Sequence, residues 1–222
     1  MAPRTYGQYC GVVTALELVG ERWALLIVRD LLVGPRRYSD LKAGLPRIPT
    51  NILATRLKEL QAAGVVRRVP LAHGLVYDLT DYGRGLEEVV LALGRWGFRA
   101  MGEPGADEIV TPDSMTTAFR TAFRPSAAAG WGCTVVVHVG DVVLTLAVDD
   151  GELTVARGAA DHATLTLAAG PAIREVIAGE VSPEEAVRTG VVHVLDGDPT
   201  ALGRFAEIFH LEAEPAPVVV PA

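Results

Sequence analysis

The sequence predicts an α+β protein, with an N-terminal winged helix-turn-helix followed by an antiparallel sheet with helices. Apolar residues recur at helical spacing through most of the first hundred positions, whereas short alternating or apolar runs between Gly and Asp turns dominate residues 131–168. The charge changes too: residues 1–100 hold 14 Lys and Arg against 9 Asp and Glu, and residues 101–222 hold 6 against 18. A basic half beside an acidic half indicates two domains, of which the first favours nucleic-acid contact.

The predicted boundaries follow this change. Residues 1–102 form a DNA-binding and dimerisation domain, 103–112 a linker, 113–211 a second domain and 212–222 a flexible tail. The chain has no N-terminal apolar run with a basic flank and no stretch approaching 18 apolar residues. We therefore expect a cytoplasmic protein without a membrane partner.

The first half begins with helices. Apolar spacing predicts one helix over residues 10–20 and another over 21–33, which Gly34-Pro35 ends. Ser39 is expected to cap a short helix over residues 40–43. A longer helix then runs from Thr50 to Ala63.

The helix from Thr50 to Ala63 has two different faces. At 100° per residue, Leu53, Leu57 and Leu60 share one side. The other side holds short polar, small or basic side chains: Thr50, Asn51, Ala54, Thr55 and Lys58. Short hydrogen-bonding groups let a helix approach base edges in the major groove. Plain exposure to water is an equal alternative, because Thr and Asn also favour the first turn of any helix.

A hairpin is expected next, with strands over residues 65–69 and 75–79. Arg67, Arg68 and His73 lie on it or near its tip, where a wing would meet phosphates or the minor groove. Ordinary solvated charges are the alternative. Two adjacent arginines directly after a polar-faced helix favour DNA contact.

The last helix of this half is expected to start at Thr80 to Gly83 and to continue to Met101. Its apolar stripe is longer than a small domain needs and includes Leu86, Val90, Leu93 and Trp96. The stripe can pack against the domain's own first helix, form a two-fold interface between subunits, or do both.

Five segments match a known family in this order: YCGV at 9–12, GERW at 20–23, LLVGPRRYSDL at 31–41, ILATRLKEL at 52–60 and YDLTDYG at 77–83. Over about residues 6–101 the chain resembles the HxlR-type winged helix-turn-helix regulators, which are relatives of the MarR family. The resemblance implies a homodimer, a recognition helix over residues 50–63 and a wing around residues 70–75. Gly11 and Pro49 depart from the Pro and Ser that the family often has there, although Pro49 still fits the first helical turn.

Together these features predict a sequence-specific transcriptional regulator that binds double-stranded DNA as a homodimer. The predicted DNA-binding residues are Arg36, Arg37, Tyr38, Thr50, Asn51, Thr55, Arg56, Lys58, Arg67, Arg68 and His73. The predicted dimer interface consists of Leu86, Val90, Leu93 and Trp96.

In the second half, Met115, Phe119 and Phe123 predict a helix over residues 114–123. Strands are expected over 131–139, 141–149, 152–156 and 163–168, and a further strand over 191–195. Helices are expected over 171–179, 182–189 and 199–209. We interpret the strands as an antiparallel meander.

No catalytic, metal-ligand or phosphate-loop pattern occurs, and the four histidines of this half have no ligand spacing. We therefore predict no enzyme, no metal and no cofactor. Cys10 and Cys133 match no zinc, redox or disulfide pattern, so reduced thiols are expected. Some members of the resembled family have an oxidant-sensing N-terminal cysteine, but nothing near Cys10 except Arg4 would lower its pKa, and an inert structural thiol is the stronger alternative.

The segment AGEVSPEEA at 178–186, followed by Gly190, residues 194–198, Leu202, Phe205 and Phe209, resembles the tail of sterol-carrier-protein-like domains. The resemblance covers about residues 113–211 and implies an apolar tunnel for a hydrophobic small-molecule effector. Candidate lining residues, for which plain core is the stronger alternative, are Met115, Phe119, Phe123, Trp131, Phe205 and Phe209. A lipid or acyl-chain carrier that uses the helix-turn-helix only to dimerise is the main alternative. A regulator whose second domain is a spacer or dimer brace is another.

Overall fold

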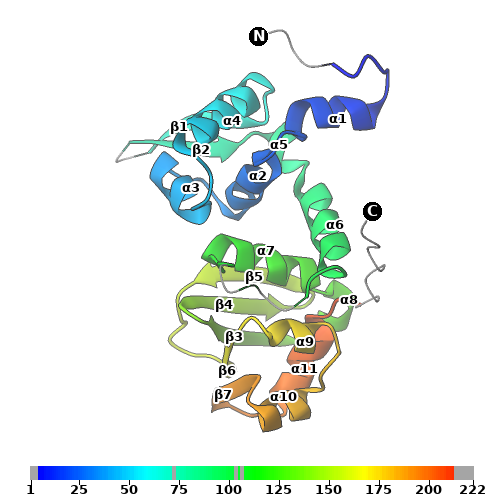
Figure 1. Ribbon diagram of the computed structural model, residues 1–222. Coiled ribbons are helices and arrows are strands. Elements are labelled where there is room, and N and C mark those ends of the chain that lie inside the picture. Colours follow the sequence, from blue (N-terminus) through cyan, green and yellow to red (C-terminus); the bar gives the residue numbers. More distant parts are fainter. Residues whose placement is uncertain (1–4, 72–73, 103–104, 106–107, 213–222) are drawn as a thin grey trace. The chain divides into compact units, whose positions relative to one another are not determined.

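The computed structural model describes residues 5–71, 74–102, 105 and 108–212 (Figure 1). Its contacts divide the chain into two compact units, Met1–Val90 and Leu91–Ala222. The division falls inside helix α6 (Glu87–Phe98), before the predicted domain boundary at residue 102.

The first unit is a helical unit with one hairpin. Its elements are α1 (Gly11–Val19), α2 (Ala24–Val33), α3 (Tyr38–Gly44), α4 (Thr50–Ala62), β1 (Val66–Leu71), β2 (Gly74–Leu79), α5 (Asp81–Arg84) and the start of α6. Strands β1 and β2 are antiparallel, with Val66 opposite Leu79. Fully buried side chains from α2, α3 and α4 form the core: Ile27, Val28, Leu31, Leu41, Leu53, Leu57 and Leu60.

The predicted start of the short third helix is wrong. Helix α3 begins at Tyr38, and the carboxylate of Asp40 accepts a hydrogen bond from the backbone N–H of Arg37 at 2.9 Å. Asp40 therefore satisfies the donor at the start of the helix, and Ser39 lies inside the first turn rather than at the cap.

The single helix predicted from Thr80 to Met101 is two helices. The hydroxyl of Thr80 accepts a hydrogen bond from the N–H of Gly83 at 3.0 Å and caps α5, which ends after four residues. Gly83 is packed so tightly that an added Cβ would lie 2.2 Å from the carbonyl oxygen of Val65. Tertiary packing thus sets the turn before α6, and helical spacing alone could not reveal it.

The second unit is a five-stranded sheet with helices. After α6 come α7 (Pro112–Ala122), α8 (Pro125–Ala128), β3 (Gly132–Val139), β4 (Val142–Asp149), β5 (Glu152–Arg157), β6 (Leu165–Ala169), α9 (Ile173–Ile177), α10 (Pro183–Thr189), β7 (Val192–Gly197) and α11 (Ala201–Ile208). The strand order is β5-β4-β3-β6-β7. The further strand expected over residues 191–195 is confirmed as β7.

The prediction of an antiparallel sheet is wrong at one pairing, because β3 and β6 are parallel. After β5 the chain crosses to the far edge of β3 and pairs there, with Val135 opposite Leu165. Alternation along a strand reports which side chains are buried and not which strand lies alongside, so the sequence pattern could not distinguish this crossover from a meander.

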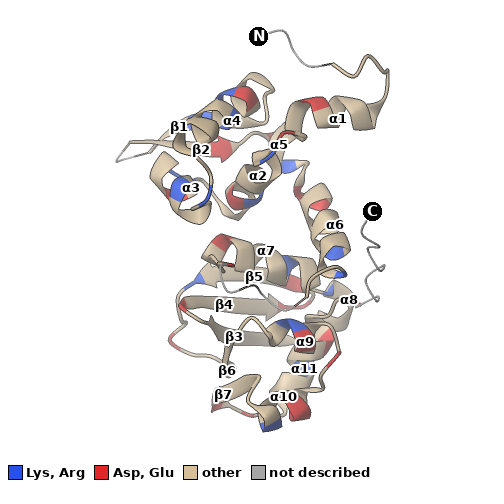
Figure 2. Ribbon diagram, viewed as in Figure 1, with Lys and Arg blue, Asp and Glu red and all other residues tan. Residues whose placement is uncertain are grey.

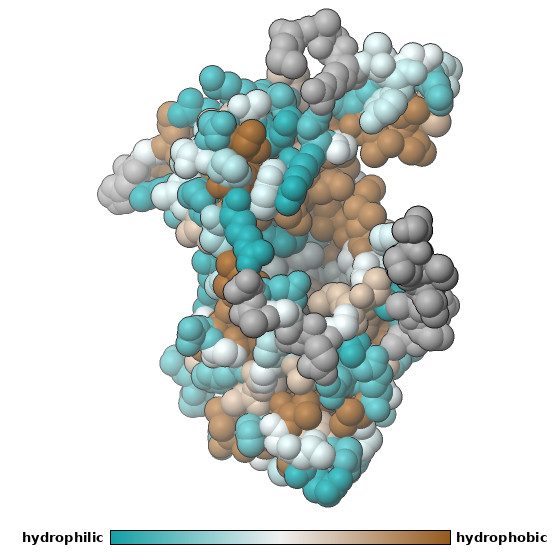
Figure 3. Space-filling view, viewed as in Figure 1, coloured by the Kyte–Doolittle hydropathy of each residue, from teal (hydrophilic) through white to brown (hydrophobic). Residues whose placement is uncertain are grey.

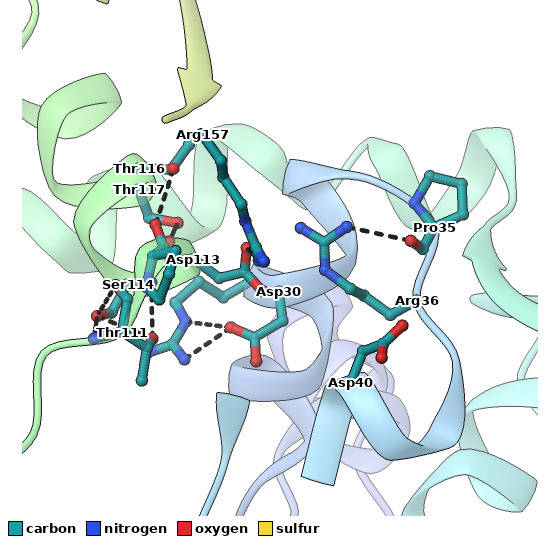
Figure 4. Close-up of polar contacts among 12 residues, drawn as sticks. Asp30, Pro35, Arg36, Asp40, Thr111, Asp113, Ser114, Thr116, Thr117 and Arg157 are labelled. Carbon is teal, nitrogen blue, oxygen red and sulfur yellow. Dashed lines mark hydrogen bonds and ion pairs between the residues drawn. The ribbon is translucent and has the colours of Figure 1, made fainter. Parts of the chain in front are cut away.

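The core of the second unit lies between one face of the sheet and the helices. Alternate residues of β3 and β4 are buried, and apolar side chains of α7, α9 and α11 cover them. The N-terminus of α7 is capped by Thr111, whose hydroxyl accepts from the N–H of Ser114 at 3.2 Å (Figure 4). Buried Asp113 accepts a hydrogen bond from Arg157 of β5 at 2.5 Å (Figure 4), which links α7 to the sheet edge.

Within the second unit, two glycines of α6 should respond oppositely to alanine. A Cβ at Gly94 would lie 2.9 Å from Oγ1 of Thr121 in α7, whereas a Cβ at Gly97 meets nothing within 4 Å. We expect Gly94→Ala to destabilise the protein by about 1–3 kcal/mol through overpacking. Gly97→Ala should stabilise it by up to about 1 kcal/mol through helix propensity. Urea unfolding followed by circular dichroism measures both, and equal shifts would contradict the packing of α6 against α7.

Candidate nucleic-acid interface

Helix α4 has a buried side and a polar side, as its periodicity predicts. Leu53, Leu57 and Leu60 are buried, whereas Thr50, Asn51, Thr55 and Lys58 are exposed. We call Asn51, Thr55 and Lys58 the polar face of α4. The hydroxyl of Thr55 donates to the carbonyl of Asn51 at 2.8 Å, so its lone pairs and its methyl group remain for contacts with a ligand.

Neighbouring elements hold the start of α4 and the hairpin. The hydroxyl of Tyr38 in α3 donates to the carbonyl of Thr50 at 2.8 Å. Arg36 pairs with Tyr77 of β2 through two backbone hydrogen bonds of 2.9 and 2.7 Å. Tyr38 therefore lies where it positions the first turn of α4, and Arg36 is joined to the hairpin by a single β-bridge. The guanidinium of Arg36 also donates to the carbonyl of Pro35 (Figure 4).

The cations among the predicted DNA-binding residues fall into two groups. The side chains of Arg37, Lys58 and Arg68 are exposed, and within the described residues they form no ion pair. The guanidinium of Arg68 lies over the ring of Tyr77, 5.8 Å from its centroid. Figure 2 shows basic residues on α3 and α4 with acidic residues among them. These three cations are available to DNA without first losing a carboxylate partner.

Arg56 and Arg67 are held by carboxylates instead. Arg56 pairs with Glu59 and, at 3.1 Å, with Glu21. Arg67 pairs with Asp78 at 3.1 Å. Part of their charge is therefore neutralised inside the unit, which lowers what they can contribute to phosphate binding. The predicted contact at His73 lies outside the described residues.

Asp78 and Arg84 are functional candidates that sequence reasoning missed. Asp78 is buried in β2, and its second carboxylate oxygen accepts from Arg84 of α5 at 2.8 Å. One buried carboxylate thus connects the base of the wing, through Arg67, with α5. An acidic residue inside an otherwise apolar strand, between Tyr77 and Leu79, was the available indication.

The predicted dimer residues differ in exposure. Val90 is buried and Leu86 half-buried, whereas Leu93 and Trp96 are 45% and 73% exposed. Sequence reasoning missed a second apolar surface on α1, where Val12 and Leu16 are 69% and 48% exposed. Figure 3 shows hydrophobic surface over both helices. Solvent-exposed Trp and Leu on helices are typical of surfaces that meet another protein.

The predicted ligand-lining residues lie in or against the core of the second unit. Phe119, Phe205 and Phe209 are fully buried, and the ring of Phe119 meets the other two edge-on at 6.3 and 5.6 Å between centroids. Phe123 packs on Phe209 at 5.7 Å. Met115 and Trp131 are partly buried against the same core. A hollow of about 280 Å³ in this unit is lined by other residues, among them Met101 and Arg174.

The two thiols have opposite environments. Cys10 is exposed at the start of α1, and the backbone N–H groups of Val13 and Val12 hold the pKa of its thiol below the ordinary value. Burial raises the pKa of the Cys133 thiol to about 11. The expectation of a buried, inert thiol at position 10 is therefore wrong, because the side chain precedes α1 instead of packing under it.

A thiol reagent should distinguish the two cysteines. At pH 8 the raised pKa keeps the Cys133 thiol protonated and therefore unreactive, and burial blocks access as well. We expect one fast equivalent in native wild-type protein, none in Cys10→Ser and an unchanged fast equivalent in Cys133→Ser, measured with a chromogenic disulfide. Two equally fast equivalents in the native protein would contradict these environments.

Within residues 5–71, 74–102, 105 and 108–212, no three His, Cys, Asp or Glu side chains are grouped so that they could hold a metal ion. In the same ranges no helix combines the length and apolarity needed to cross a bilayer.

Comparison with known proteins places the first part of the chain. The family described as HxlR-like helix-turn-helix matches residues 18–104. YvaP of Bacillus subtilis, an uncharacterized HTH-type transcriptional regulator, is 38% identical over 85 residues, which cover 37% of this chain and 79% of YvaP. YkvN of the same species, another such regulator, is 33% identical over 113 residues, which cover 48% of this chain and 96% of YkvN.

A mycobacterial relative and a solved structure match a similar share of the chain. Rv3095 of Mycobacterium tuberculosis, also an uncharacterized HTH-type transcriptional regulator, is 41% identical over 93 residues, which cover 40% of this chain and 58% of Rv3095. The reduced form of the transcriptional regulator YodB from B. subtilis is 33% identical, and the match covers 44% of this chain and 99% of YodB with a TM-score of 0.38.

Proposed function

Because this chain belongs to the HxlR-like helix-turn-helix family of transcriptional regulators, we propose that it binds specific double-stranded DNA as a homodimer. The observation that supports this most is the exposed polar face of α4. Its side chains are short or basic, and the leucines behind them anchor the helix in the core. Such a helix can enter a major groove without rearranging the unit.

Within α4, Asn51 and Lys58 are the proposed base-reading side chains. An asparagine amide can form two hydrogen bonds with adenine, and a lysine ammonium can donate to guanine O6 and N7. Thr55 would contribute its methyl group to thymine or accept a hydrogen bond, because its proton is already given to the carbonyl of Asn51. Thr50 and Tyr38 support the first turn through their mutual hydrogen bond.

Phosphate contacts are assigned first to Arg37 and Arg68, which are exposed cations without an acidic partner in the described part of the chain. Arg36, Arg56 and Arg67 also face this interface in the proposal. The ion pairs of Arg56 and Arg67 make them the weaker contributors. Such contacts position a protein on the duplex and make its affinity depend on salt.

The proposed homodimer uses the exposed apolar side chains of α6, and Leu93 and Trp96 would form its centre. The exposed Val12 and Leu16 of α1 are a second candidate surface for such association. Two recognition helices must lie about one duplex turn, roughly 34 Å, apart to read two half-sites. Association through helices outside α4 would leave both polar faces free for DNA.

Control by a hydrophobic effector in the second unit is a further part of the proposal, and its support is the resemblance to sterol-carrier-like domains. The packed rings of Phe119, Phe205 and Phe209 mean that such an effector would have to displace core side chains or use another hollow. Family membership does not favour the alternative of a lipid carrier with a helix-turn-helix used only for dimerisation.

A mobility-shift assay tests the proposed function directly. The full-length protein is titrated at low salt against the DNA upstream of its own gene and against a random duplex of equal length. We expect both to bind and the upstream DNA, if it contains the operator, to compete the more strongly. If dimeric protein binds neither duplex at low salt, the proposal is wrong.

A further inference from the structure

The first unit contains a hollow of about 310 Å³ between α1 and α5. Ala15, Leu18 and Val19 of α1 line it, together with Val65, directly before β1, and the turn between α5 and α6. We call this the α1–α5 hollow. Its volume is at the lower end of the range found for small-molecule sites, and apolar walls with a few polar groups are typical of such sites.

The polar groups of the α1–α5 hollow are a carboxylate and a phenol. Asp81 and Tyr82, adjacent residues of α5, both line it and both are exposed. Among the lining residues that the structure describes, Asp81 is the charged one and none is cationic. An ammonium group is attracted by a carboxylate and by the face of an aromatic ring, whereas an anion would be repelled here. The apolar wall favours a hydrocarbon body attached to that ammonium.

The hollow also adjoins the elements that form the DNA-binding surface. The carbonyl of Val65 accepts a hydrogen bond from the N–H of Thr80 at 3.0 Å, which joins the end of the α4 region to the start of α5. Arg84, on the same short helix as Asp81, donates to Asp78 at 2.8 Å, and Asp78 holds Arg67 of the wing. A molecule bound in the hollow therefore contacts α5. The buried carboxylate of Asp78 connects this helix to Arg67 of the wing.

We propose that the α1–α5 hollow binds a hydrophobic organic cation and that this binding alters DNA affinity through α5, Asp78 and Arg67. The proposed binding is argued from the hollow and from the charge of Asp81 alone. The coupling part rests on the proposed DNA-binding function. The cation's hydrocarbon body lies against α1 and Val65, and its ammonium group lies beside Asp81 and Tyr82.

The binding part is tested with full-length protein and two probes of the same shape, (2-phenylethyl)trimethylammonium and its neutral carbon isostere, followed by ligand-observed NMR titration. We expect wild-type protein to bind the cation more tightly than the isostere. Asp81→Asn should weaken cation binding about tenfold, as expected when one attractive charge is removed, and leave the isostere unchanged. Ala15→Phe should fill the hollow and abolish binding of both probes.

Thr14→Phe is the matched control, because Thr14 is an exposed neighbour on α1 that does not line the hollow. It should leave the binding of both probes unchanged, and circular dichroism verifies that each variant is folded. The binding part is overturned if wild-type protein binds neither probe. That result is expected if a partner subunit fills the hollow. Binding that Ala15→Phe or Asp81→Asn leaves unaltered overturns it as well.

The coupling part is tested by measuring DNA affinity with and without saturating cation. We expect a change of about fivefold or more in wild-type protein. In Arg84→Ala the cation should still bind, because Arg84 does not line the hollow, but the change in DNA affinity should disappear. An unchanged DNA affinity in wild-type protein overturns the coupling and leaves the site intact. Failure to bind DNA without any probe overturns the proposed function instead.

Discussion

Replacing Arg37 and Arg68 together by alanine is expected to weaken binding to every duplex, on the order of tenfold or more at low salt. The slope of log Kobs against log salt should fall by about 1.8, because each of the two phosphate-binding cations accounts for about 0.9. The physical reason is that both side chains are exposed and have no acidic partner in the described part of the chain. Each can therefore neutralise a phosphate and release its counterion without first breaking an ion pair. Fluorescence anisotropy between 50 and 200 mM salt, on specific and random duplexes, measures both quantities.

The matched comparison replaces Arg56 and Arg67, whose guanidinium groups are already paired with Glu59, Glu21 and Asp78. Removing them should change the slope by less for each cation than removing the unpaired set. If the slope falls more in the Arg56/Arg67 variant, the ion pairs open on DNA and the assignment of phosphate contacts must be reversed.

Asn51→Ala should behave differently from either set of cations. It should leave the salt slope unchanged and relax the preference at one base pair by about 1–3 kcal/mol, because an amide reads a base edge without carrying charge. Uniform weakening on all sequences would mean that Asn51 contacts the backbone rather than a base.

Leu93→Asp is expected to turn the proposed dimer into a monomer at micromolar concentration and to remove high-affinity binding to a two-half-site operator. A buried, unpaired carboxylate at the centre of a two-fold interface opposes dimerisation in two ways. Each subunit buries one charge without a partner, and the two like charges face each other across the axis. Leu93 is 45% exposed in the single chain, so the substitution should leave each monomer folded. Sedimentation velocity with circular dichroism measures assembly and folding separately.

Arg95→Ala is the control for Leu93→Asp. It changes the net charge by the same amount at an exposed position two residues along α6, nearly opposite on the helix. It should leave the dimer intact. A Leu93→Asp protein that still sediments as a dimer would show that this part of α6 is not the interface, and Val12 and Leu16 of α1 would be substituted next.

Much of the fold could be predicted because local spacing records burial. The leucines at 53, 57 and 60 repeat along one helical face, and the same three side chains are buried in α4. Alternation likewise located β3 and β4. Exposure of the polar face of α4 follows from the same spacing, since a helix that buries its leucines must turn the opposite side outward.

Contacts between distant residues could not be predicted in the same way. The ion pair of Arg67 with Asp78 depends on the exact register of the hairpin, which places the two residues opposite each other and withdraws an expected phosphate contact. The α1–α5 hollow brings Ala15, Val65 and Asp81 together from three separate segments. The first arrangement is set by strand register and the second by how whole elements pack, and periodic spacing records neither.

By itself, then, the order of residues determined the α+β class, the polar and apolar sides of α4, the basic first half and the kinship with a regulator family. Folding in three dimensions decided the parallel pairing of β3 with β6, the break before α6, the exposure of Cys10 and which arginines keep their charge available. The physical reason is the separation along the chain. Hydrophobic periodicity is a property of residues that are neighbours in the sequence, whereas strand partners, ion pairs and hollows form between segments that meet only when the chain is folded.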